Sequence, residues 1–354
     1  MELLTIELRP QIQSGYVYIL LQPNISMDNV KITVDNNSMI LKIGDHQLLV
    51  NFPLINVISS SFQIIDQWVI VRVQLSQSNL SHQNEVINSI ETKAIEALKI
   101  NIDLPPANEN LNIFCNFCKN TLLDNTEFKR VLSLPSEECE PSEWFCCSHS
   151  DVDYKNILCP RTNDCFYGSH YYVLNKNIFG SELTINDKDV ACNKCSSVLG
   201  IVKDENSFKI WNNSLQYSSH SFEENKKSPF DDFKLAIKEF IKNGGIFREI
   251  KFFALEKSEK LTLSVKIMDT NLSLLTKKSI NDNNEVTLEQ KQVMKVLYKI
   301  SEDVSTHPQN DSNFSICQIS IVSINAATKH LIASSQQLPP IYRSTDTYFI
   351  GYIY

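Results

Sequence analysis

Two Cys-x-x-Cys motifs are the clearest chemical feature of the sequence. The first contains Cys115 and Cys118, and the second contains Cys192 and Cys195. Each motif places two thiols on one tight turn, and four thiolates complete the tetrahedral coordination that zinc adopts in structural sites. The alternative is four unrelated thiols, which the repeated spacing makes less favourable. We therefore predict one structural zinc ion per chain, since four protein ligands leave no coordination position open for a substrate.

The segment 141-PSEWFCCSH-149, between these motifs, has two adjacent cysteines behind a tryptophan. With its neighbours it offers six further candidate metal ligands: Cys139, Cys146, Cys147, His149, Cys159 and Cys165. A complete second metal site is disfavoured, because adjacent residues rarely both reach one tetrahedral ion and no further Cys-x-x-Cys motif is present. The simplest alternative is that Trp144 and Phe145 pack in the interior while the thiols have no chemical role.

Catalysis by a cysteine is a third interpretation, because a thiolate becomes a strong nucleophile when a histidine takes up its proton. His149 or His170 could serve the adjacent cysteines in this way, but no glycine-rich or acidic context completes a protease-like arrangement. Near the C-terminus, Cys317 is the one available thiol. It lies in the apolar run FSICQISIVSI, where a thiol is more often buried and inert, so Cys317 is a weak catalytic candidate.

Length and composition limit the classes of protein to consider. A chain of 354 residues exceeds a comfortable single core, which predicts two or three domains. The net charge of −8, without a sustained run of Lys and Arg, argues against direct nucleic-acid binding. No signal peptide and no apolar stretch of about 18 residues is present, so no membrane association is expected. We predict a cytoplasmic protein that could also enter the nucleus, with its ten cysteines reduced.

Residues 1–106 are predicted to form a β-sandwich-like domain with one helix. Short runs rich in Val, Ile, Leu and Tyr recur about every ten residues, which is typical of a sandwich. The runs are LTIELRP, GYVYILLQP, NVKITVDNN, SMILKIGDH, HQLLVNFP and QWVIVRVQL. A helix is expected within 82–99, where Val86, Ile87, Ile90, Ala94 and Leu98 share one face.

Residues 107–203 are predicted to form a cysteine-rich zinc module, and residues 204–354 an α+β domain. Ser228-Pro229 followed by two aspartates predicts a helix start, and Gly244-Gly245 predicts its end. A second helix is expected from Thr287 through QKQVMKVLYKI. The expected strands are FREIKFFAL, KLTLSVKIM, FSICQISIVSI, KHLIASS and TYFIGYIY. The predicted fold class is therefore an α+β multidomain protein.

The run 130-RVLSLPSEECEPSEWFCC-147 resembles a signature of the HECT-like ubiquitin-protein ligases, also described as ubiquitin-conjugating-enzyme-binding proteins. Members of that family carry Leu-Pro-Ser, an acidic stretch and Trp-x-Cys-His between two Cys-x-x-Cys motifs. Leu134-Pro135-Ser136 matches the first part and Trp144-Phe145-Cys146 the second. Cys147 stands where histidine is usual, a tryptophan expected soon after Pro-Ser is absent, and His149 could replace the missing histidine.

The resemblance implies that the protein accepts ubiquitin from a conjugating enzyme and promotes its transfer to substrates. It also implies an alternative role, inhibition or chaperoning of the zinc endonuclease that cleaves pre-messenger RNA before polyadenylation, with Cys146 inserted into its active site. The residues expected to bind partners are Leu134, Pro135, Ser136, Trp144, Cys146, Cys147 and His149. A further alternative is a non-catalytic interaction scaffold stabilised by zinc.

Overall fold

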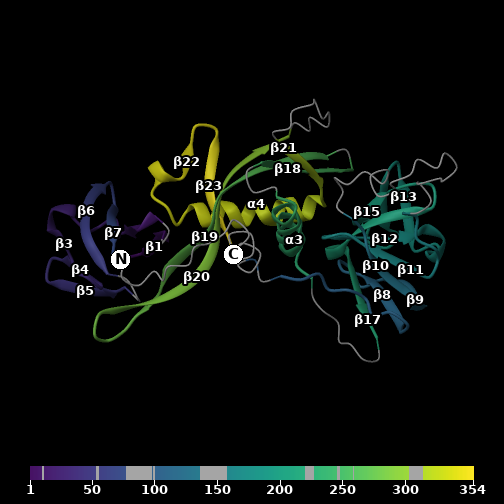
Figure 1. Cartoon of the computed structure of the whole chain (residues 1–354), viewed down its shortest axis with the longest axis horizontal. Helices are drawn as coiled ribbons and strands as arrows, with labels where there is room; N and C mark the ends of the chain where they lie inside the picture. The colour runs from purple at the N-terminus through teal and green to yellow at the C-terminus, as the bar shows by residue number, and fades with distance from the viewer. Residues whose placement is uncertain are drawn as a thin grey trace.

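Strands dominate the structure and form three sheets (Figure 1). The computed structural model describes residues 1–9, 12–52, 56–76, 98, 100–135, 158–219, 227–244, 248–257, 259–302 and 314–354. Among these residues the sheets contain 13, 7 and 3 strands. The N-terminal strands lie at one end of the molecule, the cysteine-rich sheets lie at the other, and the helices lie between them (Figure 1). The ribbon β19–β20 runs from the N-terminal strands to the region of the helices.

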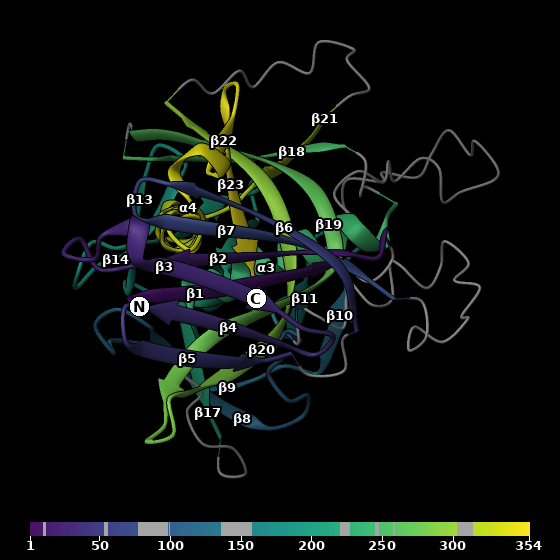
Figure 2. The ribbon, with the colours of Figure 1, turned by 90° about the vertical axis from the view of Figure 1, so that its left-hand side faces the viewer.

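The largest sheet curls into a barrel-like structure at its N-terminal end (Figure 2). Its strands there follow the order β3-β4-β5-β20-β19-β1-β2-β7-β6. Their bounds are β1 (Leu3–Arg9), β2 (Ser14–Leu20), β3 (Val30–Val34), β4 (Ser38–Ile43), β5 (His46–Asn51), β6 (Val57–Ile65), β7 (Trp68–Leu75), β19 (Glu259–Ile280) and β20 (Glu285–Ser301). One backbone hydrogen bond of 2.6 Å, from the N–H of Val57 to the carbonyl of Asn36, joins the start of β6 to the β3–β4 turn.

Alternation along the strands fills the barrel. On β1, Leu4, Ile6 and Leu8 point into an apolar cluster with Val17, Ile19 and residues of the neighbouring strands, and all of these side chains are buried. Successive side chains on a strand point to opposite faces, so Thr5 and Glu7 face the other way. Both are buried too, because the outer face of this part of the sheet is covered.

The predicted β-sandwich and α+β class are wrong. The N-terminal strands do not form a sandwich of their own, because β1 pairs with β19 and β5 with β20 in one sheet, with Thr5 opposite Thr276 and Val50 opposite Val286. A strand pattern predicts that a segment is extended but not which distant segment it pairs with. The boundaries predicted at 106/107 and 203/204 stay a prediction.

The helix predicted from Thr287 is also wrong, because this segment forms β20. Its apolar residues fit a helical period, but both faces of the strand are covered. Met294, Val296 and Tyr298 pack in one apolar cluster, and Val293 packs in another on the opposite face. A strand buried on both faces has no simple alternation, so periodicity alone cannot separate it from a helix.

The rest of the large sheet supports two α-helices and one short 3-10 helix. Its strands are β18 (Glu249–Glu256), β21 (Phe314–Gln318), β22 (Ser344–Thr345) and β23 (Tyr348–Ile353), and the helices are α3 (Pro229–Lys242), α4 (Ile321–Ser335) and the short η8 (Pro340–Tyr342). The predicted helix at 229 is confirmed: the Ser228 side chain accepts a hydrogen bond from the N–H of Phe230, and Gly244 has a φ of +74° just after the helix.

Helix α4 replaces two runs that were predicted as strands, the second half of FSICQISIVSI and KHLIASS. The Ser320 side chain caps the helix by accepting from the N–H of Ser323. Ile324, Ala327 and Leu331 then face the core at helical spacing. The helix predicted at 82–99 lies outside the described residues except for Leu98, which is buried in the cluster around α3.

The middle of the chain folds into the two smaller sheets. The seven-stranded sheet has the order β10-β11-β12-β16-β15-β14-β13, and the three-stranded sheet has the order β17-β8-β9. The bounds are β8 (Asn110–Cys115), β9 (Thr121–Glu127), β10 (Arg130–Ser133), β11 (Asp164–Tyr167), β12 (Tyr171–Asn175), β13 (Leu183–Asn186), β14 (Asp189–Cys192), β15 (Val198–Val202), β16 (Ser207–Trp211) and β17 (Leu215–Ser218). One apolar cluster joins both sheets.

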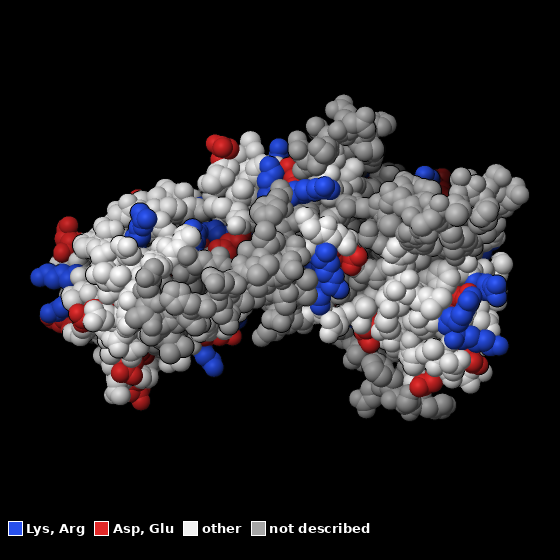
Figure 3. Space-filling view, viewed as in Figure 1, with Lys and Arg blue, Asp and Glu red and all other residues white. Residues whose placement is uncertain are grey.

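Two surface properties bear on the predicted partners. Within the part of the chain that the structure describes, no helix is long and apolar enough to span a membrane. On the face shown in Figure 3, basic and acidic atoms lie in small separate groups of both signs. The absence of direct nucleic-acid binding stays a prediction.

A buried ion pair ties β1 to β20. Glu7 is fully buried and its carboxylate accepts hydrogen bonds from Lys295, from Arg9 at 3.3 Å and from the hydroxyl of Tyr18 at 3.3 Å. Burial lowers the pKa of Lys295, although the neighbouring Glu7 carboxylate opposes the shift. A buried carboxylate is tolerated only while such partners compensate its charge.

We expect Lys295→Ala to lower the free energy of unfolding by about 3 kcal/mol, because it leaves the Glu7 charge in the interior without its ammonium partner. Lys299→Ala is the matched control: Lys299 is exposed on the same strand, so its loss should change the free energy by less than about 0.5 kcal/mol. Urea unfolding followed by circular dichroism measures both. Equal unfolding midpoints for the two variants would show that the pair does not stabilise the fold.

Candidate functional site

The two Cys-x-x-Cys motifs form equivalent turns on different strands. Cys115 ends β8 and Cys192 ends β14. In each turn the carbonyl of the first cysteine accepts a 2.9 Å hydrogen bond from the N–H of the residue that follows the second cysteine, Lys119 or Ser196. These two residues have φ values of 61° and 57°, a left-handed conformation that closes the turn. The same backbone geometry therefore presents both pairs of thiols.

The four sulfur atoms meet in one cluster that could hold a metal ion. All of them lie within 4.8 Å of one another. The Sγ atoms of Cys115 and Cys195 are 3.8 Å apart, and those of Cys118 and Cys192 are 3.7 Å apart. Tetrahedral coordination with zinc–sulfur bonds of about 2.3 Å requires sulfur–sulfur distances of about 3.8 Å. The cluster thus has the dimensions of a four-thiolate metal site.

The environment of the thiols is uneven. Cys115 and Cys192 are fully buried, whereas Cys118 and Cys195 are partly exposed. Burial raises the pKa of Cys115. Burial also acts to raise the pKa of Cys195, but hydrogen bonds from Ser197 and the neighbouring cysteines outweigh it and lower the pKa to about 6. One thiol of the cluster is therefore prepared to ionise near neutral pH, which favours capture of a cation.

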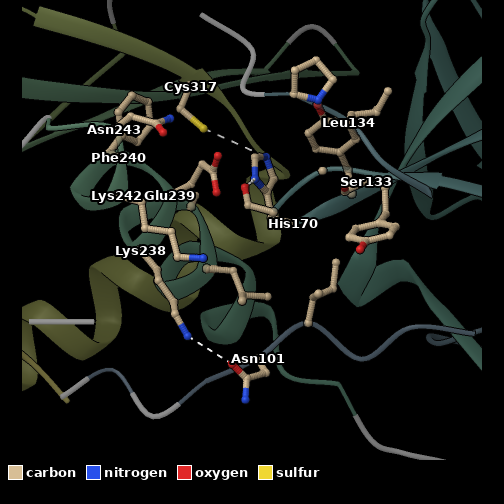
Figure 4. A pocket seen from close by; sticks show the side chains of 18 of the residues that line it. Asn101, Ser133, Leu134, His170, Lys238, Glu239, Phe240, Lys242, Asn243 and Cys317 are labelled. Carbon is tan, nitrogen blue, oxygen red and sulfur yellow. Dashed lines mark hydrogen bonds between the residues drawn. The ribbon is translucent and has the colours of Figure 1, made fainter. Parts of the chain in front are cut away.

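A cavity of about 390 Å³ lies between the seven-stranded sheet and the helix α3 (Figure 4). Leu134 and Pro135, from the end of β10, line one side of it. Lys238 and Phe240 of α3 line another side, and Cys317 of β21 closes the wall next to His170. The cavity therefore brings together the start of the signature segment, the cysteine proposed as a nucleophile and a histidine from the β11–β12 turn.

The contacts of His170 do not make it a base for Cys317. The Nε2 atom lies 4.0 Å from the Cys317 sulfur and 3.1 Å from the carbonyl oxygen of Gln318. A carbonyl can only accept, so a hydrogen bond to Gln318 requires the tautomer with a hydrogen on Nε2, in which Nδ1 accepts from the Ser169 hydroxyl at 2.9 Å. With Nε2 protonated, the ring nitrogen nearest the sulfur cannot take the proton of the thiol. Cys317 is also only 3% exposed.

The other predicted residues fall into two groups. Leu134 is held in place, since its N–H donates a 2.7 Å hydrogen bond to the carbonyl of Tyr167. Ser136, Cys139, Trp144, Cys146, Cys147 and His149 lie outside the described residues, so partner binding by this segment stays a prediction. Cys165 is buried in the module core, and Cys159 donates to Asp204 at 3.5 Å. Among the described residues, the four-cysteine cluster is the one group with the geometry of a metal site.

Sequence reasoning missed a buried polar network that joins the middle module to the two helices. Asp232, at the start of α3, accepts hydrogen bonds from the side chain of Asn212 at 2.9 Å and from the backbone N–H and side chain of Asn213. The amide of Asn213 also reaches Ser320 and Ser323 at the start of α4. Burial raises the pKa of Asp232 to about 7, against the effect of these donors.

No local sequence pattern predicts this network. In the sequence, Asp232 is one of the two aspartates that predict the helix start, a position where an acid is usually solvated. Its partners Asn212 and Asn213 lie in a polar tripeptide that resembles a loop, yet both are buried. The network fixes the wall of the cavity, because α3 lines the cavity and is anchored here to the module that carries His170.

Comparison with known proteins identifies the family of this chain. The family model described as HECT-like ubiquitin-conjugating enzyme (E2)-binding matches residues 7–350. The chain belongs to this family. The match confirms the resemblance inferred from the Leu-Pro-Ser and Trp-x-Cys residues, and it extends over nearly all of the chain, whereas the recognisable residues occupy only its middle.

Similarity between this HECT-like chain and curated proteins is local. Relatives that are named as E3 ubiquitin-protein ligases include a protein of Mus musculus, 35% identical over 97 residues (27% of this chain and 26% of that protein). A protein of Rattus norvegicus is 31% identical over 129 residues (35% and 34%), and one of Pongo abelii is 34% identical over 71 residues (20% and 18%). The matches span a fifth to a third of these relatives. No solved structure matches the chain.

The cysteine cluster predicts one metal ion per chain. We expect elemental analysis of reduced, purified protein to find about one equivalent. Cys192→Ser should lose the metal and lower the unfolding midpoint, because metal binding at such a site contributes directly to folding free energy. Cys165→Ala is the control, since Cys165 is a buried thiol of the same module outside the cluster. Protein that is folded and metal-free, or a Cys192 variant that keeps its metal, would contradict the assignment.

Proposed function

We propose that the protein binds a ubiquitin-conjugating enzyme and promotes the transfer of ubiquitin to substrate lysines. The observation that carries this proposal is the match of the E2-binding family over residues 7–350. The relatives named as ubiquitin-protein ligases support the same role. Binding of ubiquitin itself, and the identity of the conjugating enzyme and substrate, belong to the proposal.

We propose zinc as the ion of the four-cysteine cluster. Thiolates are soft ligands that select zinc among the abundant divalent cations, and the sulfur–sulfur distances suit tetrahedral coordination. With four protein ligands the ion has no open position, so its role is structural. It fixes the ends of β8 and β14 to each other and thereby holds the two sheets of the middle module together.

The surroundings of Cys317 favour transfer without a thioester on this chain. The sulfur is buried, and its nearest ring nitrogen, Nε2 of His170, lies closer to the Gln318 carbonyl oxygen (3.1 Å) than to the sulfur (4.0 Å). A ubiquitin acceptor must be reached by the C-terminus of ubiquitin and must ionise readily. We therefore propose that the protein positions the thioester of the conjugating enzyme next to the substrate and that ubiquitin moves between those two partners.

Cys317→Ser tests this mechanism. Purified variant and wild-type protein are incubated with activating enzyme, a panel of conjugating enzymes and ubiquitin, and adducts are separated with and without reductant. We expect no reductant-sensitive ubiquitin adduct on either protein and equal binding of the conjugating enzyme. An adduct on the wild type that is absent from the variant would establish covalent relay through Cys317. If no conjugating enzyme binds, the proposed function itself fails and the scaffold alternative stands.

A second candidate function is inhibition of the pre-messenger RNA cleavage endonuclease through the signature segment. It is supported by the assembly of the metal cluster from Cys115, Cys118, Cys192 and Cys195, because that set is complete without Cys146. Cys146 then stays available as a ligand for a metal in another protein. Four nearby glutamates, at 137, 138, 140 and 143, favour a cationic cleft. This role also requires that the protein reach the nucleus.

We expect Cys146→Ala to weaken binding to this endonuclease at least tenfold, because it removes the proposed metal ligand, while leaving the chain's own metal content unchanged. Cys147→Ala is the matched control, since Cys147 occupies the position of the family's histidine, and its effect should be smaller. Surface plasmon resonance with the purified endonuclease gives both affinities. Equal affinities for wild type and Cys146→Ala would eliminate insertion of this cysteine.

A further inference from the structure

The cavity between α3 and the seven-stranded sheet contains a carboxylate with which none of the described residues pairs. This group belongs to Glu239, a half-buried residue of α3 that lines the cavity. Figure 4 shows the carboxylate directed toward His170 and the interior of the cavity. A charged acceptor in a partly enclosed position favours a ligand that brings a positive charge and hydrogen-bond donors.

The two lysines of α3 that line the cavity are placed differently. Lys238 donates hydrogen bonds to the carbonyl of Ile100 and, at 3.2 Å, to the side-chain oxygen of Asn101, and Figure 4 shows its ammonium directed toward Asn101. Lys242 is exposed in the last turn of the helix, where a cation is favoured by the helix dipole and can stay in water. Glu239 is therefore the charged group of the cavity that remains for a ligand.

Apolar side chains line the walls of the same cavity. Leu134 and Pro135 contribute from the end of β10, Phe240 from α3 and Ile316 from β21. A lysine side chain meets both requirements, because its aliphatic stem can cover apolar walls while its ammonium reaches a carboxylate. An arginine side chain has a shorter aliphatic stem and a broad planar head, so apolar walls suit it less. The volume of about 390 Å³ also leaves room for the backbone on either side of the bound residue.

We propose that this cavity binds a lysine side chain of the protein to be ubiquitylated, with Glu239 accepting a hydrogen bond from the ammonium. The bound lysine serves recognition and is not the lysine that receives ubiquitin. An ammonium held on a carboxylate has no free electron pair with which to attack a thioester. The inference rests on the proposed function for the source of the lysine, whereas the binding itself is measured on this chain alone.

Titration of the full chain with small peptide mimics tests the proposal. Nα-acetyl-lysine methylamide, followed by NMR, should bind with a dissociation constant on the order of 1 mM, as is usual for so small a ligand. The norleucine analogue keeps an aliphatic side chain but lacks the ammonium, and it should bind about tenfold more weakly. Equal binding of the norleucine analogue would overturn the proposal, and so would tighter binding of the arginine or glutamate analogue.

The Glu239→Gln variant should bind the lysine mimic about tenfold more weakly, because an amide does not balance the charge of the ammonium. Lys242→Gln should bind it about twofold more tightly, since a like charge is removed from the cavity. Glu205→Gln is the matched control, as Glu205 is exposed between β15 and β16 and does not line the cavity. Equal affinities of wild type and Glu239→Gln, with both proteins folded by circular dichroism, would overturn the proposal.

Binding of the conjugating enzyme, measured with the same proteins, separates this inference from the proposed function. Glu239→Gln should bind the conjugating enzyme as the wild type does, because Glu239 contacts the substrate. If the lysine mimic binds and no conjugating enzyme does, the cavity is a lysine site without a role in ubiquitin transfer, and the proposed function fails. If a conjugating enzyme binds and the mimic does not, the assignment of the cavity alone fails.

Discussion

The ribbon formed by β19 and β20 is the constraint on which the large sheet depends. These strands have 22 and 17 residues and pair along most of their length. At one end of the ribbon they pair with β1 and β5 and complete the barrel, and at the other they pair with β18 and β23 next to the helices. The ribbon thus belongs to both ends of the large sheet (Figures 1 and 2). The first and last parts of the chain therefore meet in one sheet.

Buried polar groups fix the relative position of the packed elements in two regions. Apolar packing alone would allow these elements to shift. The buried Glu7–Lys295 pair sets β1 against β20 on the side of the sheet away from the barrel interior. The Asp232 network sets the middle module against α3 and α4. Apolar contacts tolerate small displacements, but a buried charge or amide loses free energy as soon as its partner moves. Such groups define one relative position, and the cavity beside His170 and Cys317 depends on it.

Features that are set by neighbouring residues could be predicted from the sequence, and features that are set by residues far apart in the chain could not. The metal cluster was predicted because each pair of cysteines is set by one local turn, and helix α3 was predicted because Ser228, Pro229 and Gly244 act within a turn of its ends. The sheet that joins β1 to β19 could not be predicted, since it pairs Thr5 with Thr276. Strand β6 was missed because three consecutive serines interrupt its apolar pattern. The helix expected from Thr287 failed because β20 is buried on both faces.

The structure of the middle module also determines where the connection that carries the signature residues begins and ends. Strands β10 and β11 are paired in parallel, so the chain between them must return from the end of β10 to the start of β11. Both ends of that connection are fixed: Leu134 bonds to Tyr167, and at the other end Arg130 holds Asp164 through two hydrogen bonds of 2.8 and 2.5 Å. The Arg130 guanidinium also keeps the pKa of Asp164 below its usual value, so this anchor persists in mildly acidic solution. The metal cluster braces the same module by joining β8 to β14. The connection that carries the signature residues is thereby attached to the module at two fixed points, the end of β10 and the start of β11.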